Sequence, residues 1–139
     1  MTPIAPPSAD VRTHDGRAFE VAFPPDTVRV AHMRRITRAF LRHQHIDEAV
    51  AEDAVLAVSE LVSNGVQHGC GELGLRVRCL GHGVRVEVRD SNPAPAALRV
   101  ASPDAESGRG LFLVSALAHD WGVSDNGLTT WCELRWTTC

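Results

Sequence analysis

The chain has 139 residues, of which 44% are hydrophobic and 22% charged, and this composition is typical of a single globular domain with its own core. Its formal net charge of −3 gives no general basic surface, which argues against direct nucleic-acid binding. No apolar run approaches the roughly 20 residues that a membrane-spanning helix needs, and the first residues show no signal peptide. We therefore expect a cytoplasmic protein with no membrane contact.

The lysine and cysteine content excludes several kinds of site. The chain contains no lysine, so a P-loop lysine, a Schiff-base lysine and a kinase strand lysine are all absent. Phosphate binding must then rely on arginine side chains, backbone N–H groups or a metal ion. The four cysteines form no CxxC pair and no zinc-type spacing, so we expect free thiols and no disulfide framework.

The N-terminal part is predicted to hold a tail and one strand. Residues 1–16 are rich in proline and small side chains, which predicts a flexible tail and leaves residues 17–139 as the domain. Alternating apolar residues predict a strand over 17–23. Pro24 and Pro25 end it, because proline cannot continue a hydrogen-bonded ladder.

Two helices are predicted next. Apolar residues spaced by three and four predict a helix over 28–43, with one core face and an arginine-bearing opposite face. A second apolar stripe predicts a helix from about residue 48 to 67, with Asp47 able to cap its start. Gly69 and Gly71 end this helix, because glycine readily adopts the left-handed geometry that follows a helix.

The second half of the chain returns mainly to strands. We predict two strands over 72–80 and 84–90, followed by a long loop over 91–107. A helix over 108–120 and two further strands over 121–125 and 129–136 complete the chain. Strands grouped in this way, with helices between the groups, favour an α+β fold. We expect a two-layer sandwich in which a mixed, mostly antiparallel sheet carries helices on one face.

The stretch "SELVSNGVQHG" places three polar side chains along one edge of the second helix. Glu60, Asn64 and His68 are four residues apart, so they follow each other on successive turns beside the core face. A solvated face with chance spacing is the simpler interpretation. Alternatively, a carboxylate can accept a proton from a hydroxyl, and an amide oxygen can ligate Mg²⁺. The spacing alone leaves both interpretations open.

Two later stretches could also contribute to a site. Asp90 closes the strand at "VRD", where it either starts a turn or accepts a hydrogen bond from an exocyclic amine such as that of adenine. "SGRGLFLV" sets Gly108, Arg109 and Gly110 at a predicted helix start, followed by Leu111. This stretch is either an exposed loop end or an anion site, because the N–H groups of a helix start bind anions and glycines let phosphates approach closely.

Taken in order, "SELVSNGVQHG", "VEVRDSNPAP" and "ESGRGLFLVSALAHDWGV" resemble the GHKL (Bergerat-fold) ATPases. More narrowly, they resemble the small anti-sigma-factor serine kinases abundant in actinobacteria, over roughly residues 28–136. The resemblance implies the Bergerat fold and a site for ATP with Mg²⁺. It also implies that Asn64 ligates Mg²⁺, that Glu60 is the catalytic base and that Asp90 recognises the adenine amine. The remaining nucleotide contacts that it implies are at Pro93, Gly108, Arg109, Gly110 and Leu111.

The resemblance also implies partners. Such kinases transfer the γ-phosphate of ATP to a serine of a STAS-domain anti-anti-sigma protein, and hold a sigma factor inactive when not engaged with that protein. They need no direct nucleic-acid or membrane contact. The resemblance is also compatible with a homodimer. One departure is Leu128, which stands where many relatives have lysine. This departure favours one alternative, a regulatory interaction protein without catalysis, with or without bound ATP. A second alternative is a nucleic-acid binder that uses the basic helix over 28–43.

Overall fold

The computed structural model describes residues 10–14, 16–68, 70–91 and 113–136. The elements in chain order are β1 (Asp10–His14), β2 (Ala18–Phe23), α1 (Val28–His43), α2 (Glu48–His68), β3 (Leu73–Leu80), β4 (Gly83–Arg89), β5 (Asp120–Ser124), the 3₁₀ turn η1 (Asp125–Gly127) and β6 (Thr129–Arg135). Residues 113–117 are also helical. Within these described ranges, no helix is both long and apolar enough to span a bilayer.

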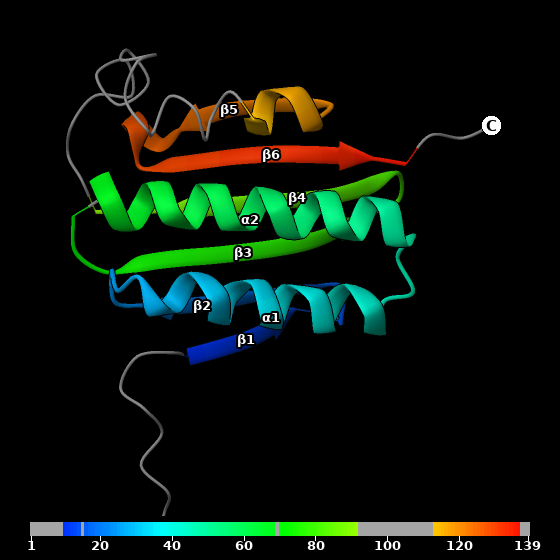
Figure 1. Ribbon diagram of the computed structural model, residues 1–139, viewed down its shortest axis with the longest axis horizontal. Helices are drawn as coiled ribbons and strands as arrows, with labels where there is room; N and C mark the ends of the chain where they lie inside the picture. The colour runs from blue at the N-terminus through cyan, green and yellow to red at the C-terminus, as the bar shows by residue number, and fades with distance from the viewer. Residues whose placement is uncertain (1–9, 15, 69, 92–112, 137–139) are drawn as a thin grey trace, which may run out of the picture.

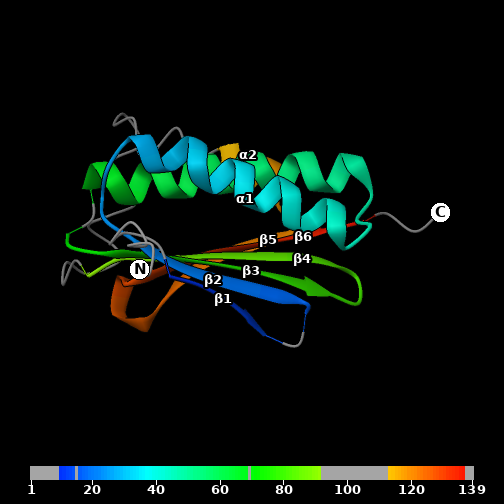
Figure 2. The ribbon, with the colours of Figure 1, turned by 90° about the horizontal axis from the view of Figure 1, so that it is seen from below.

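The strands form one sheet in the order β1-β2-β3-β4-β6-β5. Each pair of neighbours in this order is antiparallel. Figure 1 shows α1 and α2 side by side in front of the sheet, and the view from below in Figure 2 shows both on the same face. The predicted α+β two-layer sandwich is therefore confirmed.

The N-terminal strand corrects the predicted tail. Residues Asp10–His14 pair antiparallel with β2, from Asp10 opposite Ala22 to His14 opposite Ala18. The composition of residues 1–16 predicted a tail because proline and small side chains dominate its first half. The turn that closes this hairpin contains Gly16, whose φ of 71° is a conformation that glycine adopts readily. Asp-Gly is a strong hairpin signal, and it was outweighed by the proline-rich residues before it.

The core lies between the sheet and the two helices because each element turns its apolar side to that space. Residues on β3 alternate between buried and partly exposed, as a strand with one covered face requires. The rings of Phe19 on β2 and Phe40 on α1 meet edge to face with centroids 5.0 Å apart. Buried helix and strand residues form this core: Phe19, Phe23, Met33, Leu41, Val58, Leu61, Val62, Leu73, Leu75, Val77 and Val84.

The opposite face of the sheet is open and charged. Arg85 on β4 lies over the Trp131 ring, with its guanidinium carbon 4.3 Å from the ring centroid. The same guanidinium donates hydrogen bonds to Glu87 at 2.9 Å and to Glu133 at 2.7 Å. Side chains with polar heads and long apolar stems thus cover this face without a second layer of secondary structure.

Candidate functional site

The end of α2 and the end of β4 are held together at one edge of the molecule. A Cβ atom added at Gly65 would lie 3.2 Å from Leu73 Cδ2 and 3.6 Å from Val88 Cγ1, so the helix approaches the sheet closely here. Just beyond α2, the carbonyl oxygen of Cys70 accepts a hydrogen bond from the Ser91 N–H at 3.0 Å. This tie brings the last turns of α2 to the residues that follow β4.

Asn64 is a buried polar residue in this part of α2. Its residue is 8% exposed, and its Oδ1 atom has no hydrogen-bond partner in the described structure. A buried polar atom without a partner costs about 1–3 kcal/mol of stability unless a water, an ion or a ligand binds it, which makes this oxygen a candidate ligand contact. Glu60 is half-buried one turn earlier, and the i, i+4 spacing places it on the same helix edge.

Asp90 lies at the same edge, directly after β4. The residue is 3% exposed, and its backbone N–H donates a hydrogen bond to the carbonyl oxygen of Leu128 at 2.9 Å. Because any residue at position 128 supplies this carbonyl, the leucine in place of lysine does not affect how Asp90 is positioned. The structure thus brings Glu60, Asn64 and Asp90 to one region, where α2 and β4 end and β6 begins.

Thr130 is a further candidate site residue that the sequence did not predict. It lies opposite Val88 in the β4–β6 pairing and is 7% exposed. Because Val88 faces α2, Thr130 carries its hydroxyl on the helix side of the sheet. The neighbouring Thr129 points the other way and donates a hydrogen bond to Asp125 Oδ2 at 2.8 Å. A polar residue at an inward position of an alternating strand was the signal available in the sequence.

The other predicted contacts fall outside the described residues. These are Pro93, Gly108, Arg109, Gly110 and Leu111, together with residues 92–107 of the predicted long loop. The helix predicted to follow the glycines is present over residues 113–117, and Val114 is fully buried in the core. His68, to which the sequence assigned no role, is exposed at the end of α2.

The donor set at this edge suits one class of metal ion. In the part of the chain that the structure describes, no three or more His, Cys, Asp and Glu side chains gather into a metal site. A metal ion near Asn64 would therefore bind the free amide oxygen and complete its shell with phosphate and water oxygens. Mg²⁺ accepts this arrangement, because it is a hard cation that keeps several waters and few protein ligands.

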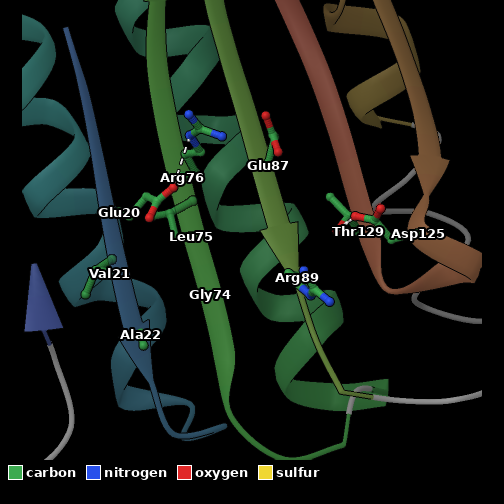
Figure 3. Close-up of a pocket in the computed structure, with 10 residues that line it drawn as sticks. All are labelled: Glu20, Val21, Ala22, Gly74, Leu75, Arg76, Glu87, Arg89, Asp125 and Thr129. Atoms are coloured by element: carbon green, nitrogen blue, oxygen red, sulfur yellow. Dashed lines mark hydrogen bonds and ion pairs between the residues drawn. The ribbon is translucent and has the colours of Figure 1, made fainter. Parts of the chain in front are cut away.

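A hollow of about 460 Å³ lies on the open face of the sheet. Its lining residues, drawn in Figure 3, are Glu20, Val21, Ala22, Gly74, Leu75, Arg76, Glu87, Arg89, Asp125 and Thr129. Of the predicted site residues, the three that the structure describes (Glu60, Asn64 and Asp90) do not line it. Two of its polar contacts are an ion pair between Arg76 and Glu20, with the nitrogen and oxygen atoms 3.2 Å apart, and a hydrogen bond from Thr129 to Asp125. We therefore place the candidate site on the helix side of the sheet.

Comparison with known protein families identifies the family of this chain. Residues 23–136 match the family described as Histidine kinase-like ATPase domain. The matched range contains every predicted site residue, from Glu60 to Leu111. The search of curated proteins finds no match. The three motifs, the sandwich fold and the family match agree, and the chain belongs to the histidine kinase-like (GHKL) ATPases.

Proposed function

We propose that this protein is a Mg-ATP-dependent serine kinase of the anti-sigma-factor type. Its substrate in this proposal is a serine of a STAS-domain anti-anti-sigma protein, and it holds a sigma factor inactive when that protein is not engaged. The observation that supports it most is the buried Asn64 Oδ1 without a partner, one turn from Glu60 and at the same edge as Asp90. If Asn64 served only to pack the core, an apolar side chain in its place would make the domain more stable.

Asp90 recognises the adenine in this proposal. Its carboxylate accepts a hydrogen bond from the exocyclic amine, in surroundings that exclude most water because the residue is 3% exposed. The hydrogen bond from the Asp90 N–H to the Leu128 carbonyl oxygen fixes the backbone that carries this carboxylate. Thr130, buried on the same side of the sheet, offers a hydroxyl for a second polar contact with the base.

Asn64 would hold the magnesium ion through its Oδ1 atom. The bound ion supplies charge stabilisation to the transferring phosphoryl group. The sequence predicts a helix start at residues 108–111, whose backbone N–H groups would bind the phosphates. Arg109 would provide the positive charge that a chain without lysine must take from arginine.

Glu60 accepts the proton of the incoming serine hydroxyl. The serine oxygen forms a bond to the γ-phosphorus as the bond from that phosphorus to the bridging oxygen breaks, and ADP leaves. General-base catalysis of this kind contributes about 10²–10⁴-fold to a rate. The half-buried position of Glu60 on the helix edge leaves the carboxylate accessible to a protein substrate.

Phosphoryl transfer to a STAS-domain protein tests this proposal. Each STAS-domain protein of the source organism is incubated with the kinase and γ-labelled ATP, and label on serine is measured. Glu60→Gln is expected to slow transfer at least about 100-fold while Mg-ATP affinity stays within about threefold. Glu52→Gln is the matched control, because Glu52 is an exposed carboxylate on the same helix. Transfer by Glu60→Gln at the wild-type rate would show that Glu60 is not the base.

The second candidate is a regulatory interaction protein without catalysis, and Leu128 is the observation that favours it. Leucine cannot contact a phosphate, so a site that needs a cation at this position is incomplete. In that case no STAS-domain protein becomes labelled, whether or not Mg-ATP binds and raises the melting temperature. Both candidate functions predict that wild type and Glu60→Gln capture a sigma factor equally well. The labelling experiment therefore decides between them.

A further inference from the structure

The hollow on the open face of the sheet is not used by the candidate nucleotide site. Its volume of about 460 Å³ lies within the range of about 300–1,000 Å³ that is typical of small-molecule pockets. Four of its lining residues form one row across the sheet, because the strand pairing sets them opposite one another: Ala22, Gly74, Arg89 and Thr129. Figure 3 shows Arg89 between Gly74 and the side chains of Thr129 and Asp125. The row therefore runs from small residues to charged and polar ones.

Gly74 leaves the floor of the hollow open. A Cβ atom added here would meet nothing within 4 Å, and the φ of this residue is not positive, so neither crowding nor the backbone conformation requires glycine. A glycine within a strand weakens the strand and often marks a place where a ligand approaches the backbone closely. Ala22, its partner on β2, has only a methyl group and widens the same space. The two small residues leave room for the body of a ligand.

Two opposite charges line this space without pairing with each other. The Thr129 hydroxyl donates a hydrogen bond to Asp125 Oδ2 at 2.8 Å, which fixes the carboxylate at the β6 side of the hollow. An ionised carboxylate has about four acceptor positions, so Asp125 can accept further hydrogen bonds. Within the described residues, Arg89 is exposed and has no hydrogen bond or ion pair. The hollow therefore presents a free guanidinium beside a positioned carboxylate.

The other charged side chains that line the hollow already have partners. Arg76 forms an ion pair with Glu20, with Nε and Oε1 3.2 Å apart. Glu87 accepts a hydrogen bond from Arg85 at 2.9 Å. Because these pairs neutralise their own charges, a ligand meets the free guanidinium and the positioned carboxylate as the available charges of the described lining. A ligand that carries one charge of each sign matches both.

We propose that this hollow binds a free α-amino acid. The carboxylate of the ligand accepts two hydrogen bonds from the Arg89 guanidinium, whose planar fork matches a carboxylate. Its ammonium group donates to Asp125, and its side chain lies over Gly74. Both charged groups of an α-amino acid are attached to one carbon atom, so one small ligand reaches two neighbouring charges of the protein. The proposal does not depend on the kinase activity proposed above.

The lining argues against two simpler ligands. A nucleotide or another multiply charged anion is repelled, because carboxylates outnumber arginines among the lining residues, with Glu20, Glu87 and Asp125 against Arg76 and Arg89. A metal ion would leave the guanidinium of Arg89 uncompensated beside it. In the part of the chain that the structure describes, no three or more His, Cys, Asp and Glu side chains gather into a metal site here. A zwitterion compensates both available charges.

Titration of the isotope-labelled full chain with each standard amino acid tests the proposal. Amide correlation spectra are recorded at about pH 7, with each amino acid added to about 10 mM. We expect at least one amino acid to shift the amide signals of Gly74, Arg89 and Thr129 saturably, with a dissociation constant of about 1 mM or lower. The α-amide and the N-acetyl derivative of that amino acid are each expected to bind at least about tenfold more weakly, because each lacks one of the two charges.

Two variants and two matched controls locate the ligand. Arg89→Gln removes the guanidinium and Gly74→Leu fills the floor, and each is expected to weaken binding at least about tenfold. Arg135→Gln removes an exposed arginine at the far end of β6, and Gly81→Leu changes a turn glycine where an added Cβ meets nothing within 4 Å. These controls are expected to change the affinity less than about threefold. Circular dichroism confirms that each variant is folded.

Several results would overturn the proposal. One is that no standard amino acid shifts the signals of the hollow, and another is that the shifts are confined to residues around Glu60 and Asp90. Binding that survives both Arg89→Gln and Gly74→Leu, or that is equally tight after N-acetylation of the ligand, also contradicts it. Inorganic phosphate bound more tightly than any amino acid would identify a simple anion site instead.

Discussion

Asn64 shows how a single residue can give up stability for a ligand. Its Oδ1 is buried without a hydrogen-bond partner, on a helix whose other buried residues include Leu61, Val62 and Gly65. A ligand that binds this oxygen recovers the interaction that the folded chain lacks. The unsatisfied oxygen therefore lowers the stability of the free protein, and binding of a cation would remove this cost.

Asn64→Leu separates these two roles. The substitution keeps the approximate volume, removes the unsatisfied oxygen and introduces a better helix former, so we expect unfolding to cost about 1 kcal/mol more. The magnesium dependence of nucleotide binding should disappear. Urea unfolding and calorimetry with and without Mg²⁺ measure the two effects. A variant that is destabilised by about as much as a core cavity would show that Asn64 is structural.

The cysteines are predicted to react in an order set by burial. Cys70, Cys79 and Cys132 are free thiols, as the sequence predicted, and Cys70 alone of the three is exposed. Burial raises the pKa of Cys132 to about 12, and burial also raises that of Cys79 despite the nearby charge of Arg17. Alkylation at about pH 8 followed by peptide mass spectrometry should label Cys70 and leave the other two unlabelled until urea is added. Labelling of Cys132 in the native protein would contradict its burial.

The sequence could identify candidate site residues only where they belong to one local motif. Glu60 and Asn64 are read from one helix, and Asp90 from its place at a strand end. Thr130 becomes a site residue because β6 pairs with β4, and no local pattern of the chain reports that pairing. Residues that meet through sheet topology require the fold before their role is visible.

At the scale of the elements, the open face of the sheet is held by a charged network across β4 and β6. Burial alone would raise the pKa of Glu133, but the hydrogen bond and the charge of Arg85 outweigh it and hold that pKa below its ordinary value of 4.5. A carboxylate with a lowered pKa in the folded state stabilises the fold above its ordinary pKa. That contribution is lost as the pH falls through the folded-state pKa.

Glu133→Gln tests this network. At about pH 7 we expect it to lower the free energy of unfolding by about 1 kcal/mol, because the pair is mostly shielded but not fully buried. The difference from wild type should shrink as the pH is lowered below about 4.5. Glu20→Gln is the control, since Glu20 pairs with Arg76 at a more exposed position. Urea unfolding at several pH values measures both, and a difference that does not change with pH would refute the assignment.

The turn between β3 and β4 offers a sharper test of the strand pairing. A Cβ atom at Gly83 would overlap the carbonyl oxygen of Leu134 and lie 2.9 Å from the Cα of Arg135, whereas one at Gly81 would meet nothing within 4 Å. Gly83→Ala is therefore expected to destabilise the protein by about 2 kcal/mol, and Gly81→Ala by less than about 0.5 kcal/mol. Equal melting temperatures for the two variants would show that the β4–β6 pairing differs here.

Elements were predictable where the apolar pattern was long or a turn signal was strong. The helix predicted over 28–43 has these bounds in the structure, because its apolar spacing continues without a break. The hairpin that turns near Asn126-Gly127 is also confirmed, with η1 between β5 and β6. Strand β1 was missed because only five residues carry its pattern, next to a proline-rich segment. Its pairing with β2, a tertiary contact, is what makes it a strand.

At the scale of the whole molecule, the fold separates two surfaces. The edge where α2, β4 and β6 meet carries the candidate nucleotide site, and the open face of the sheet carries the Arg85 network. Because the two lie on different sides of the sheet, substitutions in the Arg85 network are expected to leave nucleotide binding unchanged.

The central claim is that this edge binds a magnesium nucleotide. Titration of ATP with Mg²⁺, followed by calorimetry and by thermal melting, tests it most directly. We expect one equivalent of nucleotide to bind and to raise the melting temperature, since a ligand that binds only the folded state must stabilise it. Asp90→Asn should weaken binding at least about tenfold, because it removes the charged acceptor for the adenine amine. No heat and no melting shift at about 1 mM Mg-ATP would contradict the claim.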